Sequence, residues 1–302
     1  MSEQHTSYLH LIGALAQPQV TSVVRGSCIS EDVQNLDKIL TEWRKATELF
    51  RKIELQEQGF ADNNLPEDLA MTPKLKEIES NPLFKNTFSY VPSEFKLVEI
   101  DRLIAPQRRV SLDYVDTLLK RLPQNPTMDD LIDFCISPQQ SVPVPKNLQV
   151  GENAFSFSSP SADFRFLGGF LKDSLKEDDL KHCLSGGLPV GAMILFIGYG
   201  AGSINVLRAN NRIVLNNGFH RVYALRKKGI KKVPVVVQNV GNAALEMPPA
   251  ILGLSTDYLL KHPRPVLVKD FFEQQLTTIL RLKNTIRSVR VQWVFDQSDT
   301  PV

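Results

Sequence analysis

The chain of 302 residues has only three cysteines and lacks any long apolar run. Cys28, Cys135 and Cys183 are odd in number and far apart, which fits neither a disulfide framework nor the paired ligands of a zinc site. We therefore expect a reducing, cytoplasmic location and no metal site built from them. No segment approaches the roughly 18 consecutive apolar residues that a membrane span requires, so no membrane partner is expected. Residues 1–10 lack the basic and then apolar pattern of an export signal.

Acidic residues are missing from one part of the chain. The net charge is only +2, so the protein as a whole gives no reason to expect a polyanionic partner. Between Leu180 and Leu245, however, there is no Asp or Glu, while two histidines and nine cations occur: Lys181, Arg208, Arg212, Arg221, Arg226, Lys227, Lys228, Lys231 and Lys232. Such a run is either a solvated basic face or part of a site for an anionic ligand.

Periodicity and capping residues predict much of the secondary structure before residue 137. The expected elements are a helix over 30–58, a short helix over 73–79, a strand over 95–100, and helices over 112–119 and 127–134. Ser111 and Thr127 are expected to cap the last two helices, because their hydroxyls accept hydrogen bonds from first-turn N–H groups.

The remainder of the chain is expected to alternate loops with short elements. The Pro- and Ser-rich stretch 137–162 predicts a long loop, and such a loop is usually a lid, a binding loop or a disordered insertion. Beyond it we expect a short helix over 179–183, a buried strand over 193–197, a helix or loop at 271–272 and a last strand over 289–295. These elements suggest a helical N-terminal extension (1–92), a core (93–245) with an insertion at about 123–190, and a C-terminal extension (246–302).

Residues 203–216 predict a β-hairpin. Two β-rich runs, 203–209 and 212–216, are joined by Asn210-Asn211. Asparagine tolerates the positive φ angles that two-residue hairpin turns require. A buried strand over 233–237 is expected further along.

The hairpin leads into the sequence Asn217-Gly218-Phe219-His220-Arg221 and a short basic helix, which Asn217 is expected to cap and Gly229 to end. Backbone N–H groups at a helix start suit an anion, and a glycine lets the anion approach the backbone closely. His220 and Arg221 add side-chain donors. Cations at this end oppose the helix dipole by about 0.3–1 kcal/mol each. Arg221 and a protonated His220 are therefore unfavourable there unless a negative group lies nearby.

We interpret this turn as a site for a phosphate-bearing ligand. Asn217, Gly218, Phe219, His220 and Arg221 are the candidate binding residues. The candidate supporting residues from elsewhere in the chain are Arg208, Arg212 and Asp163.

The hairpin, the Gly-x-His-Arg turn, the helix ending in glycine and the Val-Pro-Val-Val strand resemble the nucleotide-binding core of the ParB and sulfiredoxin-like superfamily. The strand and helix of residues 95–119 resemble the opening of that fold. The resemblance implies an α+β fold with a mixed sheet, and phosphate binding by Gly218, the backbone of Phe219, His220 and Arg221. ATP or CTP with Mg²⁺ are the candidate cofactors.

The resemblance implies several activities: a nucleotide-operated DNA clamp, a nuclease, a phosphotransferase or repair of sulfinic acids. The repair enzymes carry a cysteine in this turn, where this chain has Phe219, so that activity is excluded. The clamp proteins have a Gln-Pro pair after a glycine in an earlier strand, which Gly187-Leu188-Pro189 matches only in part. No helix-turn-helix segment for reading DNA is evident downstream.

An enzyme that transfers phosphoryl groups or cleaves phosphodiesters needs a carboxylate as base or as Mg²⁺ ligand. None lies near the motif in sequence, and the candidates elsewhere are Glu99, Asp101, Asp113 and Asp163. The leading hypothesis is therefore a nucleotide- or nucleic-acid-phosphate-binding protein. The alternatives are a phosphoryl-transfer or nuclease enzyme on the same fold, and a ligand-free module that binds a protein partner or forms a homo-oligomer.

Overall fold

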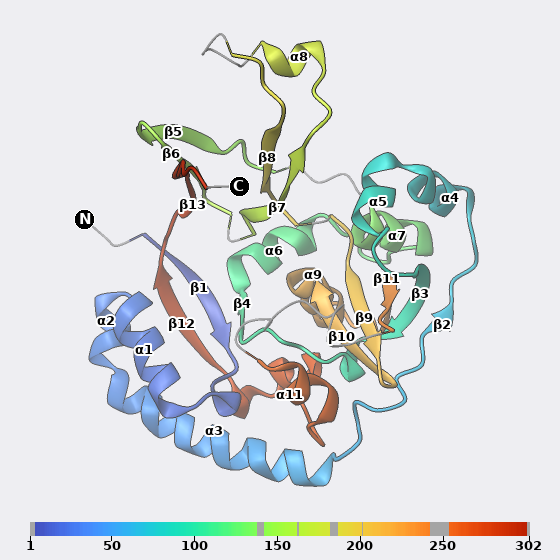
Figure 1. Cartoon of the computed structure of the whole chain (residues 1–302). Helices are drawn as coiled ribbons and strands as arrows, with labels where there is room; N and C mark the ends of the chain where they lie inside the picture. Colours follow the sequence, from blue (N-terminus) through green and yellow to red (C-terminus); the bar gives the residue numbers. More distant parts are fainter. Residues whose placement is uncertain are drawn as a thin grey trace. The chain divides into compact units, whose positions relative to one another are not determined.

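The structure, a computed structural model, describes residues 4–137, 142–161, 163–181, 187–200, 202–241 and 254–300 (Figure 1). The chain forms two compact units: unit 1 contains residues 1–140 and 201–284, and unit 2 contains residues 141–200 and 285–302. Both units contain helices and mostly antiparallel strands, which confirms the α+β class. The unit limits fall at residues 140, 200 and 284, whereas the sequence suggested limits at 92 and 245.

The larger sheet of unit 1 has five strands in the order β10-β9-β11-β3-β2. Its strands are β2 (Glu67–Asp68), β3 (Ser93–Glu99), β9 (Asn205–Ala209), β10 (Arg212–Asn217) and β11 (Lys232–Asn239). β11 is antiparallel to β3 and parallel to β9, so the sheet is mixed. The helix α9 (Phe219–Lys227) connects β10 to β11.

The local geometry of this segment confirms the predicted hairpin and the predicted helix end. Asn210 and Asn211 join β9 to β10 with φ angles of 50° and 62°. Gly229 has a φ of 87°, and its N–H donates to the Arg226 carbonyl while the Ile230 N–H donates to the Leu225 carbonyl. These two bonds form the motif that typically ends a helix at a left-handed glycine.

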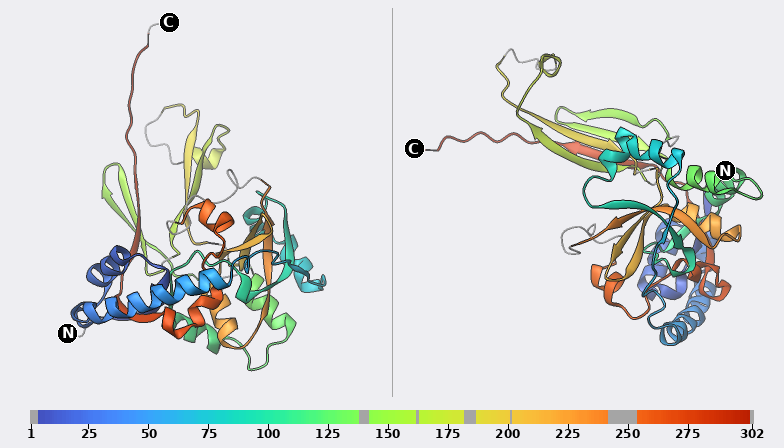
Figure 2. Two further views of the ribbon diagram at one scale, coloured as in Figure 1. Left: turned by 90° about the horizontal axis from the view of Figure 1, so that it is seen from below. Right: turned by 90° about the vertical axis from the view of Figure 1, so that its right-hand side faces the viewer.

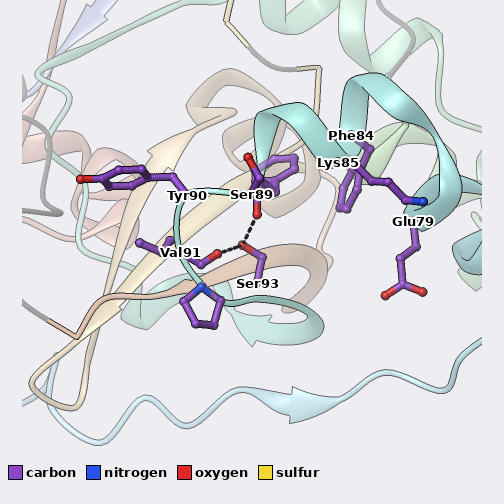
Figure 3. Close-up of a pocket in the computed structure, with 9 residues that line it drawn as sticks. Glu79, Phe84, Lys85, Ser89, Tyr90, Val91 and Ser93 are labelled. Carbon is purple, nitrogen blue, oxygen red and sulfur yellow. Dashed lines mark hydrogen bonds between the residues drawn. The ribbon is translucent and has the colours of Figure 1, made fainter.

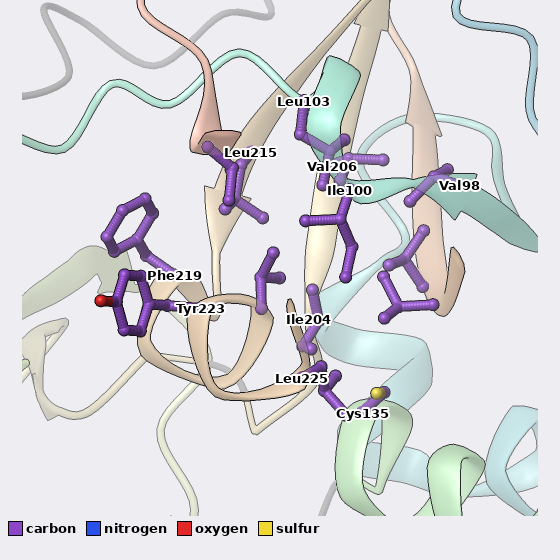
Figure 4. Close-up of a cluster of buried hydrophobic side chains, with 14 of the residues drawn as sticks. Val98, Ile100, Leu103, Cys135, Ile204, Val206, Leu215, Phe219, Tyr223 and Leu225 are labelled. Carbon is purple, nitrogen blue, oxygen red and sulfur yellow. The ribbon is translucent and has the colours of Figure 1, made fainter. Parts of the chain in front are cut away.

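The main core of unit 1 lies between α9 and this sheet. Figure 4 shows Phe219, Tyr223 and Leu225 of α9 together with Val206 and Leu215 of the hairpin, all of them buried. The α9 side chains that face the sheet are nearly all apolar. Burial of such side chains contributes roughly 1.5–3 kcal/mol each. The sheet and core thereby fix the position of the N-terminal turn of α9.

A second sheet in unit 1 joins the two ends of that unit. Its order is β12-β1-β4, with β1 (His5–His10), β4 (Arg109–Ser111) and β12 (Thr278–Lys283). β1 is antiparallel to both neighbours, and His5 pairs with Lys283. A satellite core packs on it from α1 (Gln17–Ser27), α2 (Ser30–Gln34) and the long α3 (Leu36–Gln56), which is drawn in blue in Figure 2. The single helix expected over 30–58 is thus interrupted at Asn35.

The other helices of unit 1 are α4 (Pro73–Ser80), α5 (Pro82–Thr87), α6 (Leu112–Lys120), α7 (Met128–Ile136) and α11 (Thr256–Lys261). Short 3-10 turns are η1 (Ile12–Ala14), η2 (Ile100–Arg102), η4 (Val268–Phe272) and η5 (Gln274–Leu276). The predicted caps are confirmed: the Ser111 hydroxyl accepts from the Tyr114 N–H, and the Thr127 hydroxyl accepts from the Asp130 N–H.

Unit 2 corrects two predictions. The stretch 137–162 is not one long loop, because β5 (Lys146–Gly151) and β6 (Ala154–Ser159) form a hairpin that β13 (Arg287–Gln292) extends to three strands. Phe155 and Phe157 alternate with serines along β6, which is a strand pattern. The Pro- and Ser-rich composition of the stretch led to the prediction of a loop instead. The last strand ends at Gln292, earlier than expected.

The strand expected over 193–197 exists as β8 (Ala192–Gly198), but it is not buried. Within the described residues it pairs with β7 (Arg165–Lys172) alone, and Met193 and Phe196 are 73% and 50% exposed. A two-stranded sheet buries little surface, so an apolar run does not by itself indicate a core strand. The helix α8 (Glu177–Leu180) lies between the two strands in sequence, and part of the predicted helix 179–183 lies outside the described residues.

None of the helices in the described ranges combines the length and apolarity needed to cross a membrane.

Candidate functional site

Gly218 begins α9 in the left-handed region, with a φ of 94°. A Cβ atom at this position would lie 2.7 Å from Cγ1 of Ile204, which is closer than carbon atoms approach without displacement. Both the angle and the space therefore require glycine. No side chain caps the helix, so Asn217 does not act as the cap that its position suggested. The first-turn N–H groups are left to other acceptors, as at any uncapped helix start.

The Asn217 and Phe219 side chains are used inside unit 1. The Asn217 amide donates to the Ser203 carbonyl at 3.0 Å, which fixes the chain entering β9. The Phe219 ring is 3% exposed and packs edge-on against Phe271, with ring centroids 4.9 Å apart. In this arrangement only the backbone N–H of Phe219 is suited to meet a ligand.

Carbonyl groups around the guanidinium of Arg221 offset the unfavourable position of its charge at the helix start. Its Nη1 donates to the carbonyl of Gly202 and lies 3.3 Å from the carbonyl oxygen of Phe134 and 3.5 Å from that of Cys135. These partners are the negative ends of peptide dipoles, so they offset the charge of the guanidinium. The guanidinium joins the start of α9 to the end of α7.

The surroundings of His220 keep its imidazole uncharged at neutral pH. Its Nε2 accepts a hydrogen bond from the Ser111 N–H at 3.1 Å, so its proton resides on Nδ1. Burial, and then the charge of Arg109, lower the pKa of His220 to about 4. The Tyr114 ring packs edge-on against the imidazole with centroids 5.3 Å apart. His220 therefore offers a neutral Nδ1–H donor.

Arg109 was not predicted as a site residue. It is an exposed cation, and it can take the ligand-binding role that the sequence predicted for Arg221. It lies on β4 two residues before Ser111, and its guanidinium carbon lies 4.9 Å from the centroid of the Tyr8 ring. No carboxylate pairs with it within the described ranges. The only signal in the sequence is the Arg108-Arg109 pair, which by itself does not differ from a solvated surface pair.

Four of the nine cations in the basic run of residues 181–232 pair with acids from other parts of the chain. Arg212 pairs with Asp62 at 2.6 Å, and its Nη1 donates to the carbonyls of Leu259 and His262. Three more cations pair in the same way: Arg226 with Asp101, Lys227 with Asp116 and Lys232 with Glu67. The lack of local acids in the sequence thus overstates the charge of the folded surface, and Arg212 is a buried structural residue.

Arg208 lies on β9, away from the start of α9. A hydrogen bond from Asn239, followed by the charges of Lys96 and Arg208, holds the pKa of Glu94 below its usual value. Arg208 is thereby placed near the last residues of β11. Asp163 belongs to unit 2, where its Oδ2 accepts from the Gly200 N–H at 2.8 Å and its Oδ1 lies 3.4 Å from Arg165.

Two of the three candidate carboxylates in unit 1, Asp101 and Asp113, are engaged elsewhere. Both oxygens of Asp101 accept from Arg226, and Oδ2 of Asp113 accepts from the Ser7 N–H at 3.0 Å. Glu99 ends β3 opposite Lys232. No cluster of three metal-binding side chains occurs among the described residues. The groups around the start of α9 are N–H donors, which fit an oxyanion and do not fit Mg²⁺, a cation that takes oxygen ligands.

The cysteines of unit 1 have unreactive surroundings. Cys28 and Cys135 are both free and buried. Burial raises the pKa of Cys28 to about 11 and that of Cys135 to about 12, so little thiolate forms at neutral pH. Cys183 lies outside the described residues.

A separate open cavity of about 520 Å³ lies in unit 1 between α5 and the start of β3 (Figure 3). It is lined by Glu79, Phe84, Lys85, Phe88, Ser89, Tyr90, Val91, Pro92 and Ser93. None of the residues expected from the sequence to bind a ligand lines this cavity.

Comparison of the chain with family models, curated proteins and solved structures found no match. The ParB and sulfiredoxin-like resemblance stays a prediction, based on the residues of the hairpin, turn, helix and strand.

Proposed function

We propose that this protein binds the phosphate of a nucleotide or of a nucleic acid at the start of α9. The observation that carries the proposal is the helix start itself: α9 begins directly after a left-handed glycine and no side chain caps it. Backbone N–H groups in this geometry attract an anion, because they and the helix dipole both favour negative charge. The neutral His220 supplies one more donor beside them.

The surrounding groups favour binding over catalysis. The donors at this position bind and orient a phosphate, whereas proton transfer or metal-assisted attack needs a carboxylate close to the reacting group. Asp101 and Asp113 already accept hydrogen bonds from other parts of unit 1. ATP and CTP are the nucleotides to test first, and a short oligonucleotide represents the nucleic acid.

The test is calorimetric titration of the full chain with ATP, with CTP and with a short single-stranded oligonucleotide, at two salt concentrations. A nucleic-acid ligand loses affinity steeply as salt rises, because several neutralised phosphates release counterions. A mononucleotide loses much less. Absence of binding by all three ligands at millimolar concentration would refute the proposal.

Gly218→Ala and Gly229→Ala make a matched pair for this test. Both glycines have positive φ and they stand at opposite ends of α9, so the backbone angle costs each substitution about 1–2 kcal/mol of stability, and Gly218→Ala costs more because its Cβ also meets Ile204. A Cβ at position 218 would meet Ile204 and Nη2 of Arg221 beside the first turn of α9, while a Cβ at position 229 meets no atom within 4 Å. We expect Gly218→Ala to lose phosphate affinity at least tenfold and Gly229→Ala to retain it. Thermal melts check that both variants are folded.

A further inference from the structure

His10 holds a buried polar atom without a partner. The side chain lies on β1 and is 2% exposed, and its Nε2 has no hydrogen-bond partner. A buried polar atom without a partner costs about as much as a lost hydrogen bond, so native structures retain few of them. Those that are retained call for an explanation, and a ligand that completes the bonding is one such explanation.

Arg109 lies directly opposite His10. The two residues are cross-strand partners in the β1–β4 pair, and such pairs have Cβ atoms about 4.5–5.5 Å apart. Tyr8 and His10 are two residues apart on β1 and so face the same side of the sheet. Because the Arg109 guanidinium lies over the Tyr8 ring, it is on that side as well. Arg109 is exposed, so its guanidinium meets solvent while the imidazole of His10 is buried.

His220 approaches the same strand from the other edge. β4 pairs with β1 on one side and contacts α9 on the other, where the Ser111 N–H donates to His220 (Figure 1). The charge of Arg109 contributes to lowering the pKa of both imidazoles, to about 3 for His10 and about 4 for His220. Both are thus neutral near one cation that has no carboxylate partner in the described part of the chain.

We propose that Arg109 is the cation that binds the phosphate group, with His10 and His220 as neutral partners beside it. This inference rests on the proposed function and names its charged residue, which is Arg109 on β4 rather than Arg221 on α9. Arg109 supplies a planar, permanently charged donor set, His220 supplies its Nδ1–H, and His10 supplies the ring nitrogen that lacks a partner. If Arg109 were only a solvated side chain stacked on Tyr8, no neutral histidine would be required beside it.

The experiment compares Arg109→Gln with Arg108→Gln in the full-length protein. Arg108 is the neighbouring cation, and the structure gives it no role at the site beyond a backbone carbonyl that accepts from Leu11. The probes are inorganic phosphate, CTP, ATP and a short oligonucleotide, titrated by calorimetry. Long-range proton–nitrogen NMR spectra follow the ring nitrogens of His10 and His220 in the same titrations.

We expect phosphate and nucleotide to shift the ring-nitrogen signals of both histidines in the wild-type protein. Arg109→Gln should weaken the affinity for the phosphate-bearing ligand by about 10- to 100-fold, the usual effect of losing a charge-assisted pair. Arg108→Gln should stay within about threefold of wild type. Arg109→Lys, which keeps the charge without the planar fork, should fall between wild type and Arg109→Gln.

The outcomes separate this inference from the proposed function. If the wild-type protein binds a phosphate-bearing ligand while Arg109→Gln binds it equally well, the inference is wrong and the proposed function stands. Ligand binding without any change in the His10 signals equally removes His10 from the site. If no probe binds the wild-type protein, both fall. Displacement of bound CTP by inorganic phosphate supports a site for the phosphate group itself, whereas binding of the oligonucleotide alone assigns the source of the phosphate to nucleic acid.

Discussion

Two histidines make the stability of the fold depend on pH. The folded-state pKa is about 3 for His10 and about 4 for His220, while an unfolded chain titrates histidine near 6.5. Both pKa values are lowered, so the unfolded chain binds protons that the folded chain does not. The two histidines therefore make their whole contribution to the free energy of unfolding above about pH 6.5, and this contribution falls as the pH drops toward 4.

We expect a loss of about 1.4 kcal/mol per pH unit for each histidine between about pH 6 and pH 4.5, where carboxylates contribute least. Urea unfolding at several pH values measures this slope. The His10→Gln, His220→Gln double variant should lose most of it. A slope that is unchanged in the double variant would show that other groups titrate in this window.

Arg221→Met tests whether the guanidinium serves the fold. The substitution keeps the alkyl chain and removes the donors to the carbonyls of Phe134, Cys135 and Gly202. We expect the free energy of unfolding to fall by about 1–3 kcal/mol, the cost of leaving buried acceptors unpaired. Lys120→Met, on the exposed surface of α6, is the control and should change stability by less than about 0.5 kcal/mol. If Arg221→Met melts like wild type, Arg221 is not required by the fold and its predicted role as a phosphate ligand gains weight.

At the scale of single elements, the β9–β10 turn gives a direct test of backbone strain. Asn211 has a φ of 62°, which costs a β-branched residue more than it costs asparagine or glycine. Asn211→Val should destabilise unit 1 by about 1–2 kcal/mol, whereas Asn211→Gly should be neutral or slightly stabilising. Chemical denaturation of the two variants side by side measures the difference. Equal stability would mean that the turn relaxes to another type.

The elements that the sequence predicted correctly are those with local causes. The Asn210-Asn211 turn, the Gly229 helix end and the Ser111 and Thr127 caps each depend on residues within a few positions of one another. Short-range sterics and hydrogen bonding set them, so a single sequence contains the needed information.

The elements that were missed depend on distant partners. β1 has a mixed polar sequence, and it becomes a strand because β12 and β4 lie on either side of it. The candidate site shows the same limit. The acceptors of Arg221 are backbone carbonyls of residues 134, 135 and 202, and a carbonyl has no signature in a sequence. Arg109 and His220 are likewise far apart in the chain, and only β4 brings them together.

At the scale of the whole molecule, the residues of unit 1 that come before and after the excursion of the chain into residues 141–200 lie next to each other. The Ile204 N–H donates to the Cys135 carbonyl, and the Ser203 hydroxyl donates to the Ile136 carbonyl, both at 2.6 Å. A short Gly-Ser linker in place of residues 138–201 should therefore close without strain.

We expect a chain with that linker, ending at Asn284, to unfold cooperatively and to retain the far-ultraviolet circular dichroism of a mixed α+β fold. Thermal melts and amide NMR spectra measure this. The control is the full chain under the same conditions. A shortened chain with collapsed amide dispersion would show that unit 1 needs residues 138–201 or 285–302 to fold.

The pairing of His5 with Lys283 also determines when the β1–β12 pair can form during synthesis. β1 is made well before its partner β12, which lies almost at the end of unit 1. At the usual 5–20 residues per second, β1 waits for roughly 15–55 s before the sheet can form. β4 is made much earlier than β12 and covers one edge of β1, but the other edge stays exposed over such a time, and an exposed strand edge is a hazard for aggregation. β1 carries His5, Thr6 and Ser7 in its first half, and a polar sequence lowers the tendency of an exposed strand to pair with other chains.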